Sequence, residues 1–149
     1  MNSVRFESSV KKIEVNDNGE YVTIDTGDNS FYENFKGLQN WLETEGKRIR
    51  EREKERDEAR NNGEISIVDD ASSVIDEFVN ISKEMNKKID ALFGEGALRK
   101  AFPDTKSPTL DRGMEFVSAM IPFVEEFIGE RNKQISNKYN ANRKGAHSK

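Results

Sequence analysis

Residues 67–93 read IVDDASSVIDEFVNISKEMNKKIDALF, and this stretch decides the fold. Its apolar residues recur at alternating spacings of three and four, which predicts an amphipathic helix with one apolar face. Asp69 and Asp70 lie in the first turn, where the positive end of the helix dipole favours carboxylates. The stripe consists of Val68, Ala71, Ile75, Phe78, Ser82, Met85, Ile89 and Leu92. Neighbouring segments must cover this face.

The next residues, Phe93-Gly94-Glu95-Gly96, end that helix. We interpret the two glycines as a helix C-cap and a tight turn, with a short helical turn over residues 97–102 behind them. A phosphate-binding loop would need a longer glycine pattern with a Lys-Ser/Thr pair. A functional turn, whose backbone amides face a partner, is the alternative.

A third long helix is predicted over residues 107–140, with Ser107 as its N-cap and Pro108 in the first position. An apolar stripe continues along it from Leu110 to Tyr139. Pro122 lies inside this stripe and removes one backbone hydrogen bond. Because the stripe keeps its phase, we expect a kink near residues 118–122 instead of a break.

The first long helix is predicted over residues 30–61, where Ser30 and Glu33 have capping-box spacing. Its start is aromatic, but 14 of the 18 residues from 43 to 60 are charged, seven of each sign. Opposite charges three residues apart support such a helix without burial. Three interpretations of residues 43–60 are therefore open: an exposed single helix, a partner-binding or coiled-coil arm, and a nucleic-acid contact. We expect this segment to project from the bundle.

A β-hairpin is predicted over residues 10–26, in front of the helices. Asn18-Gly19 is the preferred dipeptide for a two-residue type I′ turn. Val22 and Ile24 share one face of the return strand. A lone ribbon is marginal in water, so we expect this face to pack on the following helix. The predicted fold is mainly α: an N-terminal hairpin, three long helices and one domain over residues 1–149.

Composition argues against an enzyme. The 149 residues contain no Cys and one His, so they supply neither a thiolate metal site nor a Ser-His pair, and we expect no catalytic residue, cofactor or metal. Adjacent carboxylates on a helix diverge by about 100°, so we interpret Asp69-Asp70, Asp76-Glu77 and Glu125-Glu126 as solvated. Without an apolar run of membrane-spanning length or a signal-like segment, we expect a soluble, intracellular protein and no membrane partner.

Charge is unevenly distributed along the chain, which has a net charge of −4. Residues 129–149 carry six basic groups and one acidic group. We expect residues 141–149 to be a disordered basic tail. One interpretation is that these basic residues stabilise the negative end of the helix dipole at the C-terminus of a helix. The alternative is that they bind an acidic partner or RNA, although the acidic charge of the rest of the chain argues against nucleic acid. The narrow core predicts a marginally stable monomer and therefore self-association.

Two short motifs resemble the tail assembly chaperones of Gram-positive tailed phages, which are small siphophage-like proteins. One is Phe93-Gly94-Glu95-Gly96 with Lys100 and Phe102 behind it; the other is Lys138-Tyr139 followed by Asn142-Arg143. The order of parts is also similar: ribbon, aromatic helix start, charged stretch, glycine turn and long terminal helix. Three features have no counterpart: the loop from residue 104 to 109, Pro122 and the tail after Arg143.

The resemblance implies a non-enzymatic protein that coats the tape measure protein, keeps it soluble and is displaced by the tail tube protein. Such a chaperone acts in the host cytoplasm during assembly and is absent from the virion. The candidate partner-binding residues are Phe93, Gly94, Glu95, Gly96, Phe102, Met120, Phe123, Phe127, Tyr139 and Arg143. For the apolar residues among them, ordinary core packing is the alternative.

A second class of function fits the same composition. A small phage-encoded inhibitor of a host defence enzyme is also short, acidic, Cys-free and without catalytic residues. A nucleic-acid-binding tail protein is a third possibility, for which affinity would fall steeply with salt.

Overall fold

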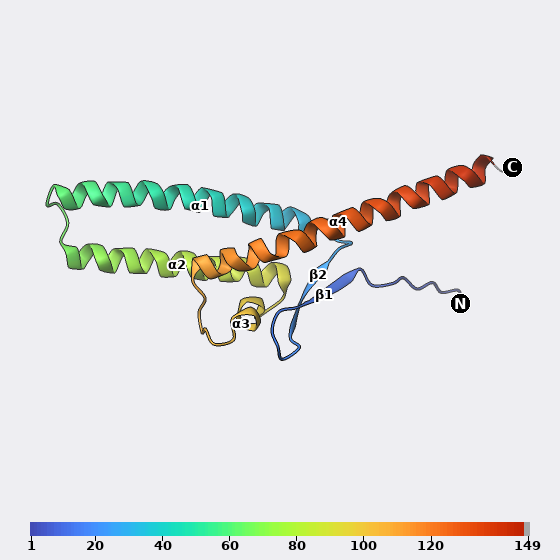
Figure 1. Cartoon of the computed structure of the whole chain (residues 1–149), viewed down its shortest axis with the longest axis horizontal. Helices are drawn as coiled ribbons and strands as arrows, with labels where there is room; N and C mark the ends of the chain where they lie inside the picture. Colours follow the sequence, from blue (N-terminus) through green and yellow to red (C-terminus); the bar gives the residue numbers. More distant parts are fainter. Residues whose placement is uncertain (148–149) are drawn as a thin grey trace.

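The fold is mainly helical with an N-terminal hairpin, as predicted (Figure 1). In a computed structural model of the chain, residues 1–147 are described, without the side chains of Ile67 and of residues 142–147. The elements are β1 (Val10–Glu14), β2 (Tyr21–Asp25), α1 (Asn29–Asn61), α2 (Ile67–Phe93), α3 (Ala97–Ala101) and α4 (Leu110–His147).

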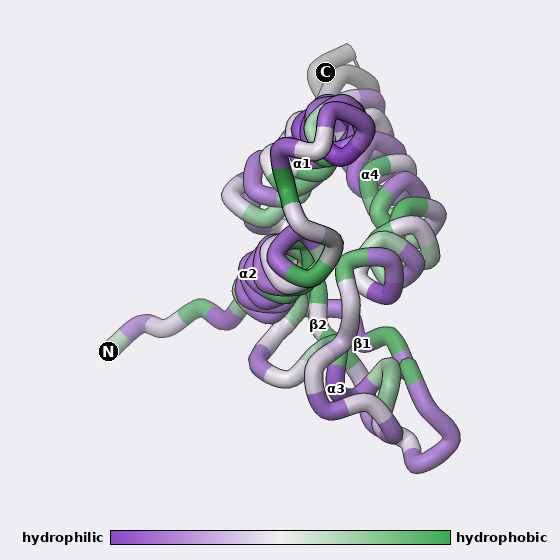
Figure 2. The backbone as a smooth tube through the Cα atoms, turned by 90° about the vertical axis from the view of Figure 1, so that its left-hand side faces the viewer, coloured by the Kyte–Doolittle hydropathy of each residue, from purple (hydrophilic) through white to green (hydrophobic). Residues whose placement is uncertain are grey.

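The long helices give the molecule an extended shape. α1 and α2 run antiparallel and form a helical hairpin, whose tip is one end of the molecule (Figure 1). α4 starts beside the middle of α2, packs along its C-terminal half and continues past the opposite end (Figure 1). Seen end on, α1, α2 and α4 occupy three separate corners (Figure 2).

The core lies where the hairpin, the start of α1, the end of α2 and the first half of α4 meet. α2 and α4 approach closely at Gly113, because a Cβ there would lie 2.6 Å from Met85 Cγ. The missing side chain thus allows the two helices to touch. The most deeply buried apolar side chains are Val22, Ile24, Met85, Ile89, Phe93, Ala97 and Leu98.

The turn of the β-hairpin differs from the predicted type I′ turn. Glu14 pairs with Tyr21, and the Val15 amide donates to the Glu20 carbonyl at 3.0 Å, so residues 16–19 form a four-residue loop. Only Gly19 has a positive φ there, at 80°, whereas a type I′ turn needs two. Asn16 explains the longer loop, because its Oδ1 accepts hydrogen bonds from the backbone N–H groups of Asn18 and Glu20.

The predicted face of β2 is correct, but its main partners are different. Val22 and Ile24 are buried, as expected from the alternation. β2 packs chiefly against α2 and α3, not against α1, which follows it in sequence. Two hydrogen bonds hold the hairpin to α3: Asn16 Nδ2 donates to the Lys100 carbonyl at 3.0 Å, and Lys100 Nζ donates to the Tyr21 carbonyl at 3.3 Å.

Two predicted helix starts are corrected. Asp28, not Ser30, caps α1, and its carboxylate accepts the Ser30 amide at 2.9 Å. Hydrogen bonds from Ser30 lower the pKa of the exposed Asp28. α4 starts at Leu110, not behind Ser107. The Pro108 carbonyl instead accepts a hydrogen bond from Asn86 Nδ2 of α2.

A serine from α2 caps the start of α4. Ser82 Oγ accepts the buried Leu110 amide at 2.9 Å and donates to the Phe78 carbonyl at 2.9 Å. Ser82 itself is 5% exposed, so water cannot replace it. The polar residue inside the apolar stripe of α2 thus fixes where α4 begins.

We expect Ser82→Ala to lower the free energy of unfolding by about 1–3 kcal/mol, because the Leu110 amide becomes buried and unsatisfied. Urea denaturation followed by circular dichroism measures the change. Ser72→Ala, on the exposed part of the same helix, is the control and should have little effect. Equal stability of both variants would contradict a capping role for Ser82.

The last helix is longer than predicted. α4 runs through Pro122 without interruption, so the expectation that proline does not break it is confirmed; a kink there stays a prediction. The helix continues to His147, so the expected disorder from residue 141 is wrong for residues 141–147. Gly145 is the weakest helix former in that stretch, and no further proline follows. Residues 148–149 lie outside the described part.

Candidate interaction surface

Phe93, the first predicted partner-binding residue, lies at the centre of the core. It is 1% exposed. Its ring meets those of Phe31, Phe35 and Phe116 edge to face, with centres 5.7, 6.2 and 5.1 Å away. Such contacts favour a fixed geometry. Phe93 therefore packs α1, α2 and α4 together and is not available to a partner.

The two glycines of the Phe-Gly-Glu-Gly motif shape the joint between α2 and α3. Gly94 has φ 105° and Gly96 has φ 75°, which L side chains rarely adopt. The Gly94 carbonyl accepts the Ala97 amide at 3.2 Å, so the chain reverses within one turn. These positions are explained by the helix C-cap and tight turn predicted from the sequence. Glu95 is exposed beside them.

The remaining predicted contacts are divided between core and surface. Met120 is buried. Phe102 and Phe127 are half-buried, and the Arg112 guanidinium carbon lies 5.0 Å from the ring centre of Phe102. Phe123 and Tyr139 are exposed on α4. The side chain of Arg143 is outside the described part of the structure.

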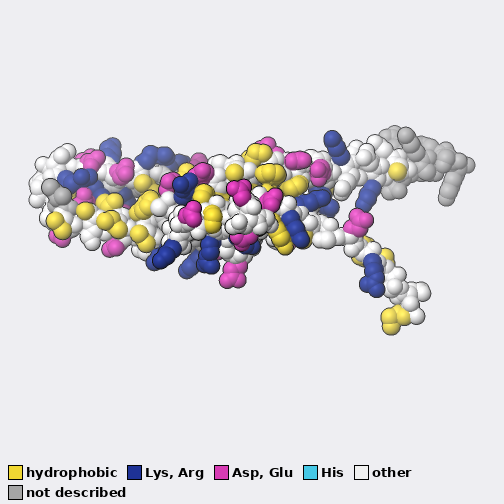
Figure 3. All heavy atoms as spheres, turned by 60° about the horizontal axis from the view of Figure 1, so that its bottom comes forward, with side chains coloured by type: hydrophobic (Ala, Val, Ile, Leu, Met, Phe, Trp, Pro, Cys, Tyr) yellow, Lys and Arg dark blue, Asp and Glu magenta, His cyan; other side chains and the backbone are white. Residues whose placement is uncertain are grey.

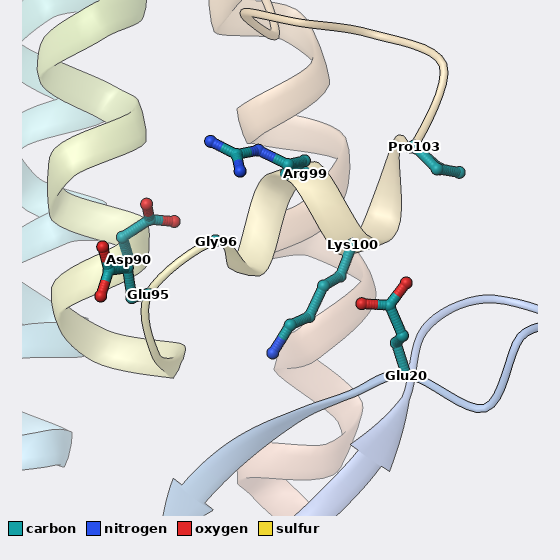
Figure 4. A pocket seen from close by; sticks show the side chains of 7 residues that line it. All are labelled: Glu20, Asp90, Glu95, Gly96, Arg99, Lys100 and Pro103. Carbon is teal, nitrogen blue, oxygen red and sulfur yellow. The ribbon is translucent and has the colours of Figure 1, made fainter.

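A polar hollow of about 510 Å³ lies beside the glycine turn (Figure 4). Its lining includes Glu95 and Gly96 of the motif, with Asp90, Arg99 and Lys100. In Figure 4, Asp90 and Glu95 lie together at the end of α2, and Glu20 lies apart on the hairpin. Carboxylates that do not converge on one point offer contacts to a charged segment, but no focused site for acid–base chemistry.

Two further kinds of site are absent from the described part of the chain. Among the side chains that the structure describes, up to residue 141, Asp and Glu form no group of three or more that could hold a metal ion. Likewise, no described helix combines the length and the apolar character needed to cross a bilayer.

The charged half of α1 is not a free arm, because three arginines connect it to α2. Arg60 Nε lies 3.0 Å from Asp70 Oδ2, and Arg56 Nε lies 3.7 Å from Asp70 Oδ1. Arg56 and Arg52 both pair with Glu77. The Asp70 side chain is 7% exposed. We call these five residues the arginine cluster. Asp70 and Glu77 are therefore not solvated, contrary to the expectation.

One face of α2 remains exposed in its N-terminal half. We call Val68, Ala71, Ile75, Phe78 and Val79 the α2 stripe. Ile75 is 61% exposed and Phe78 43%, whereas Met85 and Ile89, further along the same helix, are fully buried. The difference arises because α4 begins opposite Ser82 and covers only the second half of that face. Figure 3 shows hydrophobic side chains at the corresponding end of the molecule.

The stripe of α4 is similarly exposed at its far end. Upstream, Val117 and Val124 are buried, whereas Ile135 is 66% and Tyr139 64% exposed. We call residues 128–141 the α4 tail. The α4 tail passes Tyr32 near residue 131. Burial raises the pKa of the Tyr32 phenol, and the positive charge of Arg131 opposes this rise. Beyond that point the helix extends away from the other elements (Figure 1).

Sequence reasoning missed the arginine cluster and the exposure of the α2 stripe. Arg52, Arg56 and Arg60 are spaced four apart, and therefore share a face of α1. Asp70 and Glu77, seven apart, share a face of α2. This complementary spacing was the available signal for the cluster. The start of α4 at Leu110, which leaves the stripe uncovered, had no clear signal.

Comparisons with known proteins give one family match. The model of the family of unknown function DUF6673 matches residues 18–149. A search of the curated proteins and a search of the solved structures gave no significant match. The matched part covers the second strand and all four helices, and thus both exposed stripes. The chain therefore belongs to the DUF6673 family.

Proposed function

We propose that the protein is a phage tail assembly chaperone that binds the tape measure protein and keeps it soluble until the tail tube protein polymerises around it. It would do so in the host cytoplasm and be absent from the mature virion. The proposal takes its class from the resemblance in the glycine turn and the C-terminal motif. It takes its binding surface from the α2 stripe.

The exposed α2 stripe is the observation that carries the proposal. Its residues repeat at helical spacing along α2, next to the antiparallel α1. An amphipathic helix laid along this face would bury the stripe as α4 buries its continuation at Met85 and Ile89. A tape measure protein is a long helical chain with apolar stripes and offers many such segments.

The size of the stripe fits a temporary contact. It has five apolar side chains, and Phe78 and Val79 are less than half exposed, so a single contact would be weak. Many chaperone copies along one long client would hold through avidity. Tail tube subunits could then displace them one at a time.

Co-expression tests this function. The tape measure protein is produced alone, with the wild-type protein, and with Phe78→Asp or Asn80→Asp variants. We expect the wild type and Asn80→Asp to keep the client in the soluble fraction and Phe78→Asp to lose most of this effect. Asn80 is two residues from Phe78, about 200° around the helix, and receives the same charge.

Two results would overturn the function. One is a tape measure protein that stays soluble when it is produced without this chain. The other is a Phe78→Asp variant that protects the tape measure protein as well as the wild type does. Purification of a tight complex with a host nuclease, and none with the client, would favour the defence-inhibitor class instead.

A further inference from the structure

We infer that the α2 stripe of one copy binds the α4 tail of a second copy, so that the chain assembles head to tail. The inference concerns the protein in the absence of a client, since a client helix and a second copy would compete for the same stripe. It rests on the position, length and charge of two surfaces that the fold leaves uncovered.

The two surfaces lie at opposite ends of the molecule. The α2 stripe is on the tip of the α1–α2 hairpin, and the α4 tail projects from the other end (Figure 1). α4 runs parallel to α2, since Leu110 meets Ser82 and Gly113 meets Met85 and Ile89. A tail from the next copy can therefore lie on the uncovered part of α2 in the same direction as the resident α4.

The two surfaces also have matching lengths. Residues 68–79 of α2 and residues 128–141 of α4 each extend about 20 Å at 1.5 Å per residue. Each presents its apolar groups on one helical face. Ile128, Ile135 and Tyr139 continue the face on which Val117 and Val124 are buried. A docked tail would thus repeat the contact that α2 and α4 already make within one chain.

Charge favours this pairing. Residues 43–60 carry seven groups of each sign, and residues 61–82 carry five acidic groups and no basic one, so the hairpin tip has a net charge of −5. Residues 128–149, which are the α4 tail and the residues after it, carry six basic groups and one acidic group, a net charge of +5. These opposite charges attract the tail of one copy to the hairpin tip of another, whereas two tips or two tails repel each other.

The symmetry of such a contact has a definite consequence. Because the two surfaces differ, the contact is heterologous, and every open assembly still presents one free tip and one free tail. Assembly then continues into open chains or closes into rings. A symmetric dimer, by contrast, would use the same surface twice.

Complementation between two variants tests the inference. Ile75→Asp disables the tip and Ile135→Asp disables the tail; both positions are more than 60% exposed, so both variants should fold, as circular dichroism would verify. In analytical ultracentrifugation, we expect wild-type protein to form larger species with rising concentration and each variant to remain a monomer. The assembly midpoint of each variant should rise about tenfold or more.

Mixing the two variants gives the decisive result. The Ile75→Asp copy keeps a good tail and the Ile135→Asp copy keeps a good tip, so together they should form a 1:1 dimer and nothing larger. Asn80→Asp and Asn137→Asp, on the opposite faces of the two helices, should assemble like the wild type.

Several outcomes would overturn the inference. Monomeric wild-type protein at every concentration would do so, as would variants that assemble normally or a mixture that stays monomeric. If Ile75→Asp failed to assemble while Ile135→Asp assembled normally, the contact would be a symmetric one between two tips. These outcomes are measured without a client, so they are independent of whether the chain protects a tape measure protein.

Discussion

Phe93→Ala is expected to lower the free energy of unfolding by about 3–5 kcal/mol, the usual loss when a buried aromatic ring becomes alanine. The ring is 1% exposed and touches three other phenylalanines, so its removal leaves a cavity among α1, α2 and α4. Small domains have only about 5–15 kcal/mol in total. Urea denaturation followed by circular dichroism should therefore show a much lower midpoint, or an unfolded protein.

Phe123→Ala is the matched control. The same side chain on α4 is 39% exposed, so its loss should cost far less. Phe93→Leu keeps most of the volume and should fall between the two, which provides a folded variant even if Phe93→Ala does not fold. A stable Phe93→Ala variant that no longer binds a client would instead return Phe93 to the binding surface.

Arg56→Met is expected to lower the free energy of unfolding by about 3 kcal/mol, because loss of one partner leaves buried charge uncompensated. Arg56 is 18% exposed and pairs with both Asp70 and Glu77, which are themselves largely buried. Arg60 and Arg52 still pair with these carboxylates, which limits the loss. Hydrogen exchange should increase chiefly in the facing parts of α1 and α2.

The double variant Arg56→Met, Glu77→Met should recover much of the free energy of unfolding that Arg56→Met loses. It removes the Glu77 carboxylate, which the single variant leaves buried without Arg56. Lys47→Met is the control on α1: Lys47 and Glu43 are 3.8 Å apart but highly exposed, and such pairs contribute about 1 kcal/mol or less. Equal effects of Arg56→Met and Lys47→Met would show that the arginine cluster stabilises little.

Local signals predicted the elements well. The three- and four-residue spacing placed α2 at residues 67–93, as found, and the alternation placed Val22 and Ile24 on the buried face of β2. The turn of the hairpin was wrong because the Asn18-Gly19 preference competes with Asn16, whose side chain organises a longer loop. Helix starts were wrong where caps came from Asp28 or, across space, from Ser82.

The candidate partner residues show the limit of local reasoning. An apolar stripe predicts a face that needs covering, but not which part of the face its neighbours reach. Phe93 and Met120 proved to be core, whereas Ile75 and Phe78, which had been placed on the stripe and not among the contacts, are exposed.

The sequence by itself determined the helices, the hairpin, the uneven charge and the apolar faces, because each of these depends on residues close together in the chain. The tertiary structure alone decided where α4 begins on α2 and which arginines meet Asp70 and Glu77. Those contacts join segments far apart in sequence, and the offset between α2 and α4 leaves half of each apolar stripe in solvent.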